Sequence, residues 1–441
     1  MSPLKKIKVT AIEINKKRRA KAAVVFPEVA GRNLELSPVA RLEEAVGLAM
    51  AIDLDVVHQE IVKLRTVRPA SFLGQGIIDK LAAVAAEREI DLLIVDSALT
   101  SVQQRTLENK LGLKVIDRTA LILEIFGERA QTREGKLQVE LAHLTYQRSR
   151  LVRSWTHLER QRGGAGFLGG PGETQIELDR RIIDDKIVKI KKELEKVRKT
   201  RSLQRHARER IPYPVVALVG YTNAGKSTWF NLLTQAGVLA EDMLFATLDP
   251  SMRKIRLPSG REVILSDTVG FISDLPHELV MAFRATLEEV LAANVIVHVR
   301  DISNPDNKSQ RRDVINVLNS LGLERLEDRD DYLELINKID LLPPDQRRHW
   351  EEQAARFPRL LPVSAVSGEG RAEFLQKLDD CLAASFLLEK VKIPASDGRL
   401  AAWIHANAEV LQQKLQGETL FLSLKISPEN FSRLKKHLAD L

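Results

Sequence analysis

Residues 215–233 read VVALVGYTNAGKSTWFNLL: an apolar run, a glycine-rich loop and an amphipathic segment. The loop matches GxxxxGKS at Gly220–Ser227, between a strand expected at Val215–Val219 and a helix expected from Lys226. This order favours polyphosphate binding, because small residues let backbone N–H groups point inward beside a helix N-terminus. We expect Lys226 to neutralise the β- and γ-phosphates and the Ser227 hydroxyl to ligate Mg²⁺. The predicted phosphate contacts are Gly220, Tyr221, Thr222, Asn223, Ala224, Gly225, Lys226 and Ser227.

A second motif, Asp267-Thr268-Val269-Gly270, follows the expected strand Glu262–Ser266. A carboxylate at the C-terminal end of a strand, level with the phosphate loop, can hold Mg²⁺ through water, and the Gly270 N–H can approach the γ-phosphate. A DxxG pattern alone is weak evidence for a nucleotide site. Its position one hairpin after the phosphate loop makes that evidence stronger. We therefore predict that all four residues contact the nucleotide, with Asp267 as a water-mediated Mg²⁺ ligand.

Base recognition is predicted at Asn337-Lys338-Ile339-Asp340, which follows the apolar run YLELI. Guanine presents an N1–H and a 2-amino group that one carboxylate can accept together, so Asp340 is expected to read the base. Asn337 can hydrogen-bond the opposite edge, and the Lys338 stem can cover the ring. Adenine would leave Asp340 facing no donor, and a buried unpaired carboxylate is costly. Ser364-Ala365-Val366, after the next strand, fits a backbone donor to the guanine oxygen.

Hydrolysis of a γ-phosphate by in-line attack needs charge neutralisation, for which Lys226 and Gly270 are candidates, and a group that orients the water. The residue after Gly270, where Ras-type enzymes carry glutamine, is Phe271, whose apolar side chain cannot polarise water. We expect slow intrinsic hydrolysis, with the water positioned by backbone, another switch residue or a partner. Asn223 is either a turn residue or, as in potassium-assisted relatives, the ligand of a K⁺ ion.

The rest of the chain divides into further units of a predominantly α/β protein. Strand and helix patterns alternate through residues 1–135, which predicts an N-terminal α/β domain around a largely parallel sheet. Heptad series from Leu137 to Leu158 and from Ile176 to Val197 flank a glycine-rich stretch at 163–172 and predict an antiparallel helical hairpin over residues 136–210. Residues 211–384 are expected to form a doubly wound GTPase domain, and residues 385–441 a small αβ unit with a helix near Leu400–Gln413.

The charge of the chain is concentrated in the predicted hairpin. The 441 residues carry 67 Lys and Arg against 60 Asp and Glu, a formal +7 that names no partner by itself. Residues Arg148–Arg210 hold 18 basic and 9 acidic residues, and such a run is either a solvated face or a surface for structured RNA. Its net charge and glycine-rich tip favour RNA. The candidate RNA contacts are Gly163, Gly164, Gly169, Gly170, Gly172, Lys189, Lys192 and Lys196.

The single cysteine and the short apolar runs indicate the cellular compartment in which we expect the protein. The single cysteine, Cys381, excludes an internal disulfide and fits a reducing environment. No apolar run approaches the length of a membrane span, and no secretion signal is visible. We expect a cytoplasmic monomer with no integral membrane segment and no DNA partner.

Several segments resemble the HflX family of ribosome-associated GTPases. They are GGPGETQIELDRR (169–181), FATLDPSMR (245–253) and DTVGFISDLPHELV (267–280), together with LGQGIIDKL (73–81) and LVRSW (151–155), so the resemblance covers nearly the whole chain. It implies that Phe245, Ala246, Thr247, Leu248 and Asp249 form switch I, with Thr247 as a catalytic residue and second Mg²⁺ ligand. The residues alone leave Thr228 and Thr234 as competing hydroxyls.

The same resemblance implies a partner and a task. HflX proteins bind the 50S ribosomal subunit and its rRNA, with the hairpin tip directed at the peptidyl-transferase region, and split or rescue stalled or idle ribosomes under stress. Two other classes of function stay open. One is a GTP-regulated ribosome-assembly or RNA-modification adaptor. The other is a P-loop small-molecule kinase, which would not need NKID and for which no acceptor site is visible.

Overall fold

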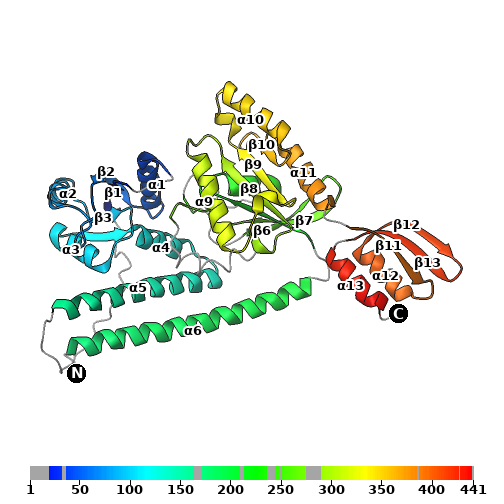
Figure 1. Ribbon diagram of the computed structural model, residues 1–441, viewed down its shortest axis with the longest axis horizontal. Helices are drawn as coiled ribbons and strands as arrows, with labels where there is room; N and C mark the ends of the chain where they lie inside the picture. The colour runs from blue at the N-terminus through cyan, green and yellow to red at the C-terminus, as the bar shows by residue number, and fades with distance from the viewer. Residues whose placement is uncertain are drawn as a thin grey trace.

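The fold is seen in a computed structural model that describes residues 19–31, 36–161, 171–208, 213–235, 244–245, 247, 251–274, 290–384, 387–426 and 428–439. An N-terminal α/β domain, a long helical hairpin, a central six-stranded sheet with its helices and a small C-terminal unit follow one another along the chain (Figure 1). The predicted fold class is therefore confirmed. No helix in these ranges combines the length and apolarity that a membrane span requires.

The N-terminal domain surrounds a four-stranded parallel sheet with the order β2-β1-β3-β4. Its strands are β1 (Lys21–Val29), β2 (Asp55–Leu64), β3 (Leu92–Val95) and β4 (Lys114–Asp117), and its helices are α1 (Pro38–Met50), α2 (Gln75–Arg88), α3 (Ser101–Leu111) and α4 (Arg118–Arg129). Apolar residues alternate between the two faces, so α1 and α4 pack on one face and α2 and α3 on the other. A Thr100–Gln103 capping box begins α3.

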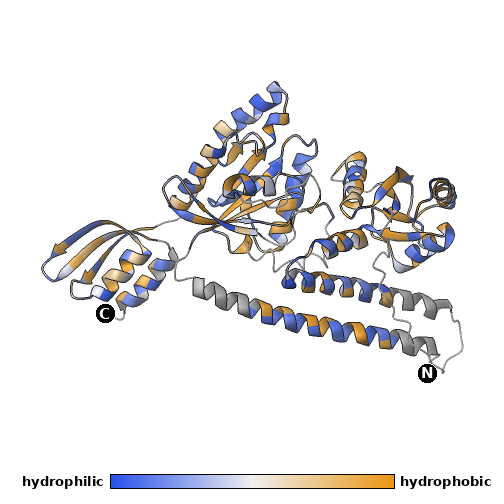
Figure 2. Cartoon of the chain, turned by 180° about the vertical axis from the view of Figure 1, so that it is seen from behind, coloured by the Kyte–Doolittle hydropathy of each residue, from blue (hydrophilic) through white to orange (hydrophobic). Residues whose placement is uncertain are grey.

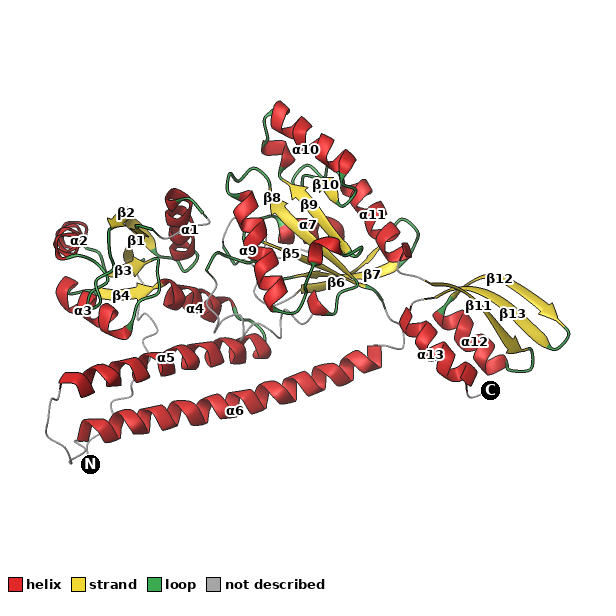
Figure 3. Cartoon of the chain, viewed as in Figure 1, coloured by secondary structure: helices red, strands yellow, loops and turns green. Residues whose placement is uncertain are grey.

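The hairpin consists of α5 (Arg133–Gln161) and α6 (Pro171–Arg208), which run side by side in opposite directions (Figure 3). Leu144, Ile187 and Ile190 are buried between the two helices, as the heptad spacing predicts. Along the described part of α6, apolar bands alternate with polar ones (Figure 2). The seam buries Ile187 and Ile190, whereas Leu178, Ile182 and Val188 are exposed on the same helix together with many of its basic residues.

The central sheet has six strands in the order β10-β9-β8-β5-β7-β6, and all neighbours are parallel except β6 and β7. The strands are β5 (Val215–Gly220), β6 (Ser251–Arg256), β7 (Glu262–Asp267), β8 (Val295–Asp301), β9 (Tyr332–Asn337) and β10 (Leu360–Pro362). The helices are α7 (Lys226–Thr234), α9 (Asn307–Ser320), α10 (Pro344–Arg356) and α11 (Arg371–Ala384), with short 3-10 turns η1 (Leu326–Asp328) and η2 (Ile339–Leu341). Helices α7 and α11 cover one face and α9 the other, so the sheet is doubly wound.

The C-terminal unit differs from the sequence prediction in the length of one helix. Its elements are β11 (Leu387–Pro394), α12 (Gly398–Asn407), β12 (Glu409–Gln416), β13 (Thr419–Ile426) and α13 (Pro428–Ala439). The predicted helix over Leu400–Gln413 is wrong after Asn407, because Glu409–Gln416 pairs antiparallel with β13 through a turn at Gly417. Residues 411–416 (LQQKLQ) favour a helix locally, but pairing with β13 through the left-handed Gly417 is stronger than this preference.

Candidate nucleotide-binding site

Two glycines shape the loop between β5 and α7. Gly220 has a φ of 152°, and a Cβ there would lie 2.2 Å from the carbonyl oxygen of Val299. Gly225 has a φ of 97°, and a Cβ there would lie 2.3 Å from Nδ2 of Asn337. Neither position accepts a side chain without displacing its neighbours. The two glycines therefore let the loop pack closely against β8 and Asn337, directly before the N-terminus of α7.

Lys226 lies buried at the start of α7. Its ammonium donates to the carbonyl oxygens of Gly220 at 3.1 Å and Tyr221 at 2.8 Å. Burial lowers the pKa of Lys226 to about 8, and the nearby Asp267 carboxylate partly opposes that shift. An anion placed in the loop would favour the charged ammonium in the same way. The position therefore suits a phosphate-neutralising cation.

Three oxygen-bearing side chains from three segments converge beside the loop. Ser227 Oγ lies 2.8 Å from Thr247 Oγ1, and both hydroxyls donate to Oδ2 of Asp267, at 2.7 Å and 3.0 Å respectively. The other carboxylate oxygen, Oδ1, is buried and has no hydrogen-bond partner among the described residues. Burial raises the pKa of Asp267, against the lowering effect of Lys226. Two hydroxyls and an under-partnered carboxylate form an all-oxygen set, which is the kind that Mg²⁺ prefers.

The segment after β7 is attached to the loop through its backbone. Thr222 N–H donates to Phe271 C=O at 2.7 Å, and Phe271 N–H donates to Gly220 C=O at 3.1 Å. A Cβ on Gly270 would lie 2.8 Å from Cγ2 of Thr222 and 3.0 Å from Nζ of Lys226, so only glycine fits at that position. The Phe271 ring is buried and faces away from solvent. It has no polar atom with which to orient water.

The base-recognition motif starts where β9 ends. Asn337 is buried, donates from Nδ2 to Ala224 C=O at 2.8 Å, and accepts at Oδ1 from Ala365 N–H at 3.0 Å. It thereby connects the phosphate loop to the segment after β10. Asp340 is exposed on η2. The four motifs thus meet at the carboxyl ends of neighbouring strands, where doubly wound sheets bind ligands.

Lys338 and the Ser364–Val366 segment, which are also predicted to contact the base, are held in position by an ion pair and by hydrogen bonds within the protein. Lys338 has a left-handed backbone with a φ of 65°, and its ammonium pairs with Asp301 at 2.7 Å. In the Ser364–Val366 segment, the Ser364 N–H donates to Glu369 C=O at 3.1 Å, and Ala365 N–H is used by Asn337. The Val366 amide is the one of the three without a hydrogen bond among the described residues. It is therefore the candidate donor to the guanine oxygen.

Comparison with known proteins identifies the family. Models described as GTP-binding GTPase N-terminal, GTP-binding GTPase Middle Region, 50S ribosome-binding GTPase and HflX C-terminal domain match residues 39–127, 129–208, 215–338 and 350–441. GTPase HflX of Magnetococcus marinus is 50% identical over 394 residues, which cover 89% of this chain and 90% of that protein. The chain belongs to the HflX family of GTPases. The predicted family and the predicted GTP hydrolysis are therefore confirmed.

A second relative matches this HflX-family GTPase over a similar share of both chains. GTPase HflX of Escherichia coli is 39% identical over 385 residues, covering 87% of this chain and 89% of that protein. Among solved structures, SsGBP in complex with GDP aligns with a TM-score of 0.48 and 23% identity, covering 82% of this chain and 98% of that one.

The structure describes only part of the predicted switch I and of the predicted hairpin tip in this HflX-family chain. Phe245 is buried, and its ring packs edge-on against Phe126 of α4 with centroids 4.6 Å apart, so the side chain lies in the domain interface. Ala246, Leu248, Asp249, Gly163, Gly164, Gly169 and Gly170 lie outside the described residues. Gly172 falls in the first turn of α6, and Lys189, Lys192 and Lys196 are exposed along that helix.

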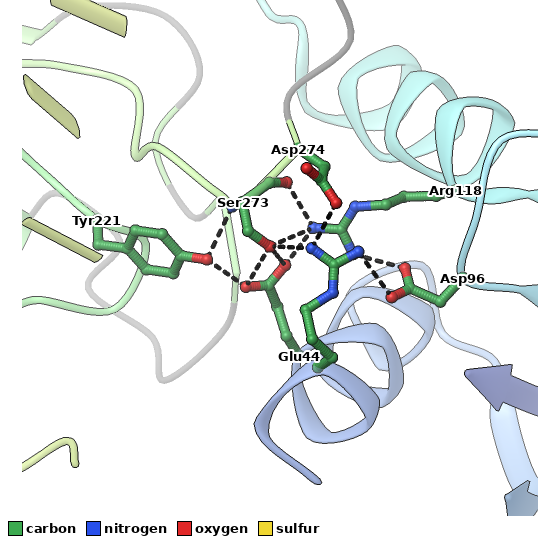
Figure 4. A network of polar contacts seen from close by, with 7 residues as sticks. Glu44, Asp96, Arg118, Tyr221, Ser273 and Asp274 are labelled. Carbon is green, nitrogen blue, oxygen red and sulfur yellow. Dashed lines mark hydrogen bonds and ion pairs between the residues drawn. The ribbon is translucent and has the colours of Figure 1, made fainter. Parts of the chain in front are cut away.

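A buried polar network, which the sequence did not predict, joins the N-terminal domain to this site (Figure 4). Arg118, at the start of α4, donates to Oδ1 of Asp96 at 2.6 Å and also pairs with Glu44. The same guanidinium donates to the carbonyl oxygen of Ser273 at 2.8 Å and to its Oγ at 3.2 Å. Ser273 follows the DTVG motif by three residues. The N-terminal domain therefore holds the end of that segment directly.

Arg41 and Tyr221 extend the network. Arg41 donates to Oγ of Ser273 at 2.6 Å and pairs with Oδ2 of Asp274 at 2.9 Å. The Tyr221 hydroxyl, from the phosphate loop itself, donates to Glu44 and accepts from Ser273 N–H at 2.8 Å. Burial, together with the Glu44 carboxylate, raises the pKa of Tyr221 well above its usual value, so the phenol stays protonated. Both the phosphate loop and the segment after DTVG are thus anchored to one neighbouring domain.

The residue before Arg118 contacts the hairpin. Asp117 caps α4 by accepting from Ala120 N–H at 2.8 Å. Its carboxylate also accepts from the Tyr146 hydroxyl at 2.9 Å and pairs with Arg150 at 3.2 Å, both on α5. The Asp117–Arg118 dipeptide therefore contacts the hairpin with one side chain and the nucleotide-side loop with the other.

Proposed function

We propose that this GTPase binds the large (50S) ribosomal subunit and its rRNA through the hairpin and splits or rescues stalled or idle ribosomes under stress. The observation that carries the proposal is the match of the GTPase domain to the family described as 50S ribosome-binding GTPase, next to a hairpin with exposed lysines. Structured RNA attracts such a surface through phosphate charge. The protein would act as a cytoplasmic monomer.

The site residues take the following roles in this proposal. Ser227 and Thr247 would ligate Mg²⁺ directly and Asp267 through water, since their oxygens already converge. When bound, Mg²⁺ supplies neutralising charge to the β- and γ-phosphates. Lys226 would neutralise the same phosphates, and the Gly270 N–H would donate to the γ-phosphate. With Phe271 buried, no side chain at that position orients the attacking water, so we expect slow hydrolysis without a partner, stimulated on the ribosome.

Asn223 is proposed as a K⁺ ligand rather than only a turn residue. Its backbone is left-handed, with a φ of 59°, which asparagine tolerates. Its side chain is exposed and makes no hydrogen bond among the described residues, whereas a turn asparagine commonly bonds its own backbone. We expect GTP hydrolysis to be faster in potassium than in sodium salts at equal ionic strength. Equal rates in the two salts would remove this role.

The Asp117–Arg118 contacts provide a route between the nucleotide and the hairpin. A γ-phosphate that draws in Gly270 would displace Ser273, three residues later, and strain its bonds to Arg118 and Arg41. Because Asp117 binds α5, movement of this dipeptide would be transmitted to the hairpin. GTP would thus favour docking of the hairpin, and hydrolysis would permit release.

Neutralising the exposed hairpin lysines tests the proposal. Changing Lys189, Lys192 and Lys196 together to glutamine should weaken binding to purified 50S subunits in the presence of a non-hydrolysable GTP analogue. The slope of log affinity against log salt should become shallower by about 2 to 3, since each of the three lost phosphate contacts removes ~0.7–0.9. GTP affinity should be unchanged, because α6 contributes no residue to the nucleotide site. Sedimentation over a salt series measures the slope.

A matched triple variant distinguishes a specific contact of the hairpin lysines from a general effect of lost positive charge. Lys390, Lys392 and Lys414 are also exposed, on strands of the C-terminal unit, and their joint change to glutamine should leave more of the binding intact. Equal weakening by both triple variants would contradict a hairpin-specific contact. Binding to assembly intermediates in preference to mature 50S subunits would favour the ribosome-assembly adaptor instead.

A further inference from the structure

Trp229 lies on the buried face of α7, three residues after Lys226, and is fully inaccessible to solvent. Its ring packs edge-on against Phe374 of α11, with centroids 5.6 Å apart at 76°. A buried indole needs a partner for its one N–H. Here Nε1 donates to Oδ1 of Asn337 at 3.1 Å. A side chain of the phosphate-loop helix therefore bonds the residue that is expected to read one edge of the base.

The Asn337 amide is held in one orientation by three bonds. Its oxygen accepts from Trp229 and from the Ala365 N–H, and its nitrogen donates to Ala224 C=O. Rotating the amide by half a turn would place its NH₂ against two donors and its oxygen against a carbonyl. Since an amide nitrogen carries two hydrogens and Ala224 takes one, the second stays available. The acceptors on the edge of guanine opposite Asp340 are N7 and O6.

We propose that Trp229 is a positioning residue for guanine recognition, which fixes the Asn337 amide so that its second N–H donates to N7 of the base. Trp229 does not touch the nucleotide and acts through Asn337. Hydrophobic periodicity does not identify this role, because it does not distinguish an indole that has a polar partner from any other apolar residue of an amphipathic helix.

The test compares GDP with 7-deaza-GDP, in which a C–H replaces N7, by calorimetry on the full-length chain with Mg²⁺. The wild-type chain should bind GDP more tightly than 7-deaza-GDP. Trp229→Phe keeps an aromatic ring against Phe374 and removes the N–H, so it should lower GDP affinity about fivefold, the usual worth of one hydrogen bond. Affinity for 7-deaza-GDP should change much less, so the preference between the two nucleotides shrinks.

Two further variants separate hydrogen bonding from packing. Phe374→Leu disturbs the ring contact but keeps the indole N–H, so it should lower the melting temperature and preserve the preference for GDP. Trp403→Phe makes the same chemical change on α12 of the C-terminal unit and should alter neither affinity. The proposal is overturned if the wild-type chain does not discriminate, if Trp229→Phe weakens both nucleotides equally, or if Phe374→Leu reduces the preference as much. No ribosomal component enters the test, so its result is independent of the partner proposed above.

Discussion

Replacing Arg118 by alanine is expected to lower the free energy of unfolding of the intact chain by about 3 kcal/mol, the low end for breaking a buried ion pair. The guanidinium is almost fully buried and binds Asp96, Glu44 and Ser273 together. Its removal leaves two carboxylates in the domain interface with fewer donors, and a buried carboxylate without a partner is costly. Urea unfolding of the full-length protein, followed by circular dichroism, measures the loss.

A surface arginine provides the matched control for this prediction. Arg133 pairs with Glu193 at 3.7 Å, and its side chain is 79% exposed, so Arg133→Ala should change the same free energy by less than about 0.5 kcal/mol. Arg118→Lys keeps the charge but loses the planar fork, and we expect an intermediate loss. If Arg118→Ala proved as mild as Arg133→Ala, the network would not hold the two domains together in solution.

The nucleotide site could be predicted from sequence because each of its motifs is local. The phosphate loop needs a strand, two glycines and a helix within a short segment, and the residues that satisfy this are contiguous. Asp267 and Asn337 end strands whose apolar runs are easy to recognise. Parallel packing then brings strand ends to one edge of the sheet, so the meeting of the motifs follows from their order along the chain.

The interface network could not be predicted in the same way. Arg118 and Ser273 are separated by 155 residues, and nothing in either local pattern identifies the other as its partner. An Asp-Arg pair at the junction of a strand and a helix was the available signal, since charged residues at such a point are rarely buried without partners. The prediction of a helix over the residues of β12 was wrong for a related reason. Pairing of β12 with β13 outweighs the helical preference of the residues in β12.

Replacing Asp340 by asparagine is expected to lower the affinity for GTP by about a hundredfold and to create affinity for xanthosine triphosphate. In the proposed site the carboxylate would accept both the N1–H and the 2-amino group of guanine, whereas an amide would oppose the amino group with its own N–H donors. Losing one hydrogen bond to a charged acceptor and removing the charge from the acceptor of the other is worth ~3 kcal/mol, which gives the hundredfold change. Xanthine carries a carbonyl at that position and accepts the new donor. Competition of the two triphosphates for bound labelled GDP measures the exchange of specificity.

A neighbouring aspartate controls for the change of charge. Asp345 is exposed in the first turn of α10, five residues further on, and Asp345→Asn should leave both affinities as they are. Because Asp340 is itself exposed on η2, its replacement should not change the melting temperature, so a loss of GTP binding can be assigned to recognition rather than folding. Retained preference for GTP in Asp340→Asn would contradict the assignment of this carboxylate to the base. It would also leave the Asn337 edge, held by Trp229, as the main source of guanine selectivity.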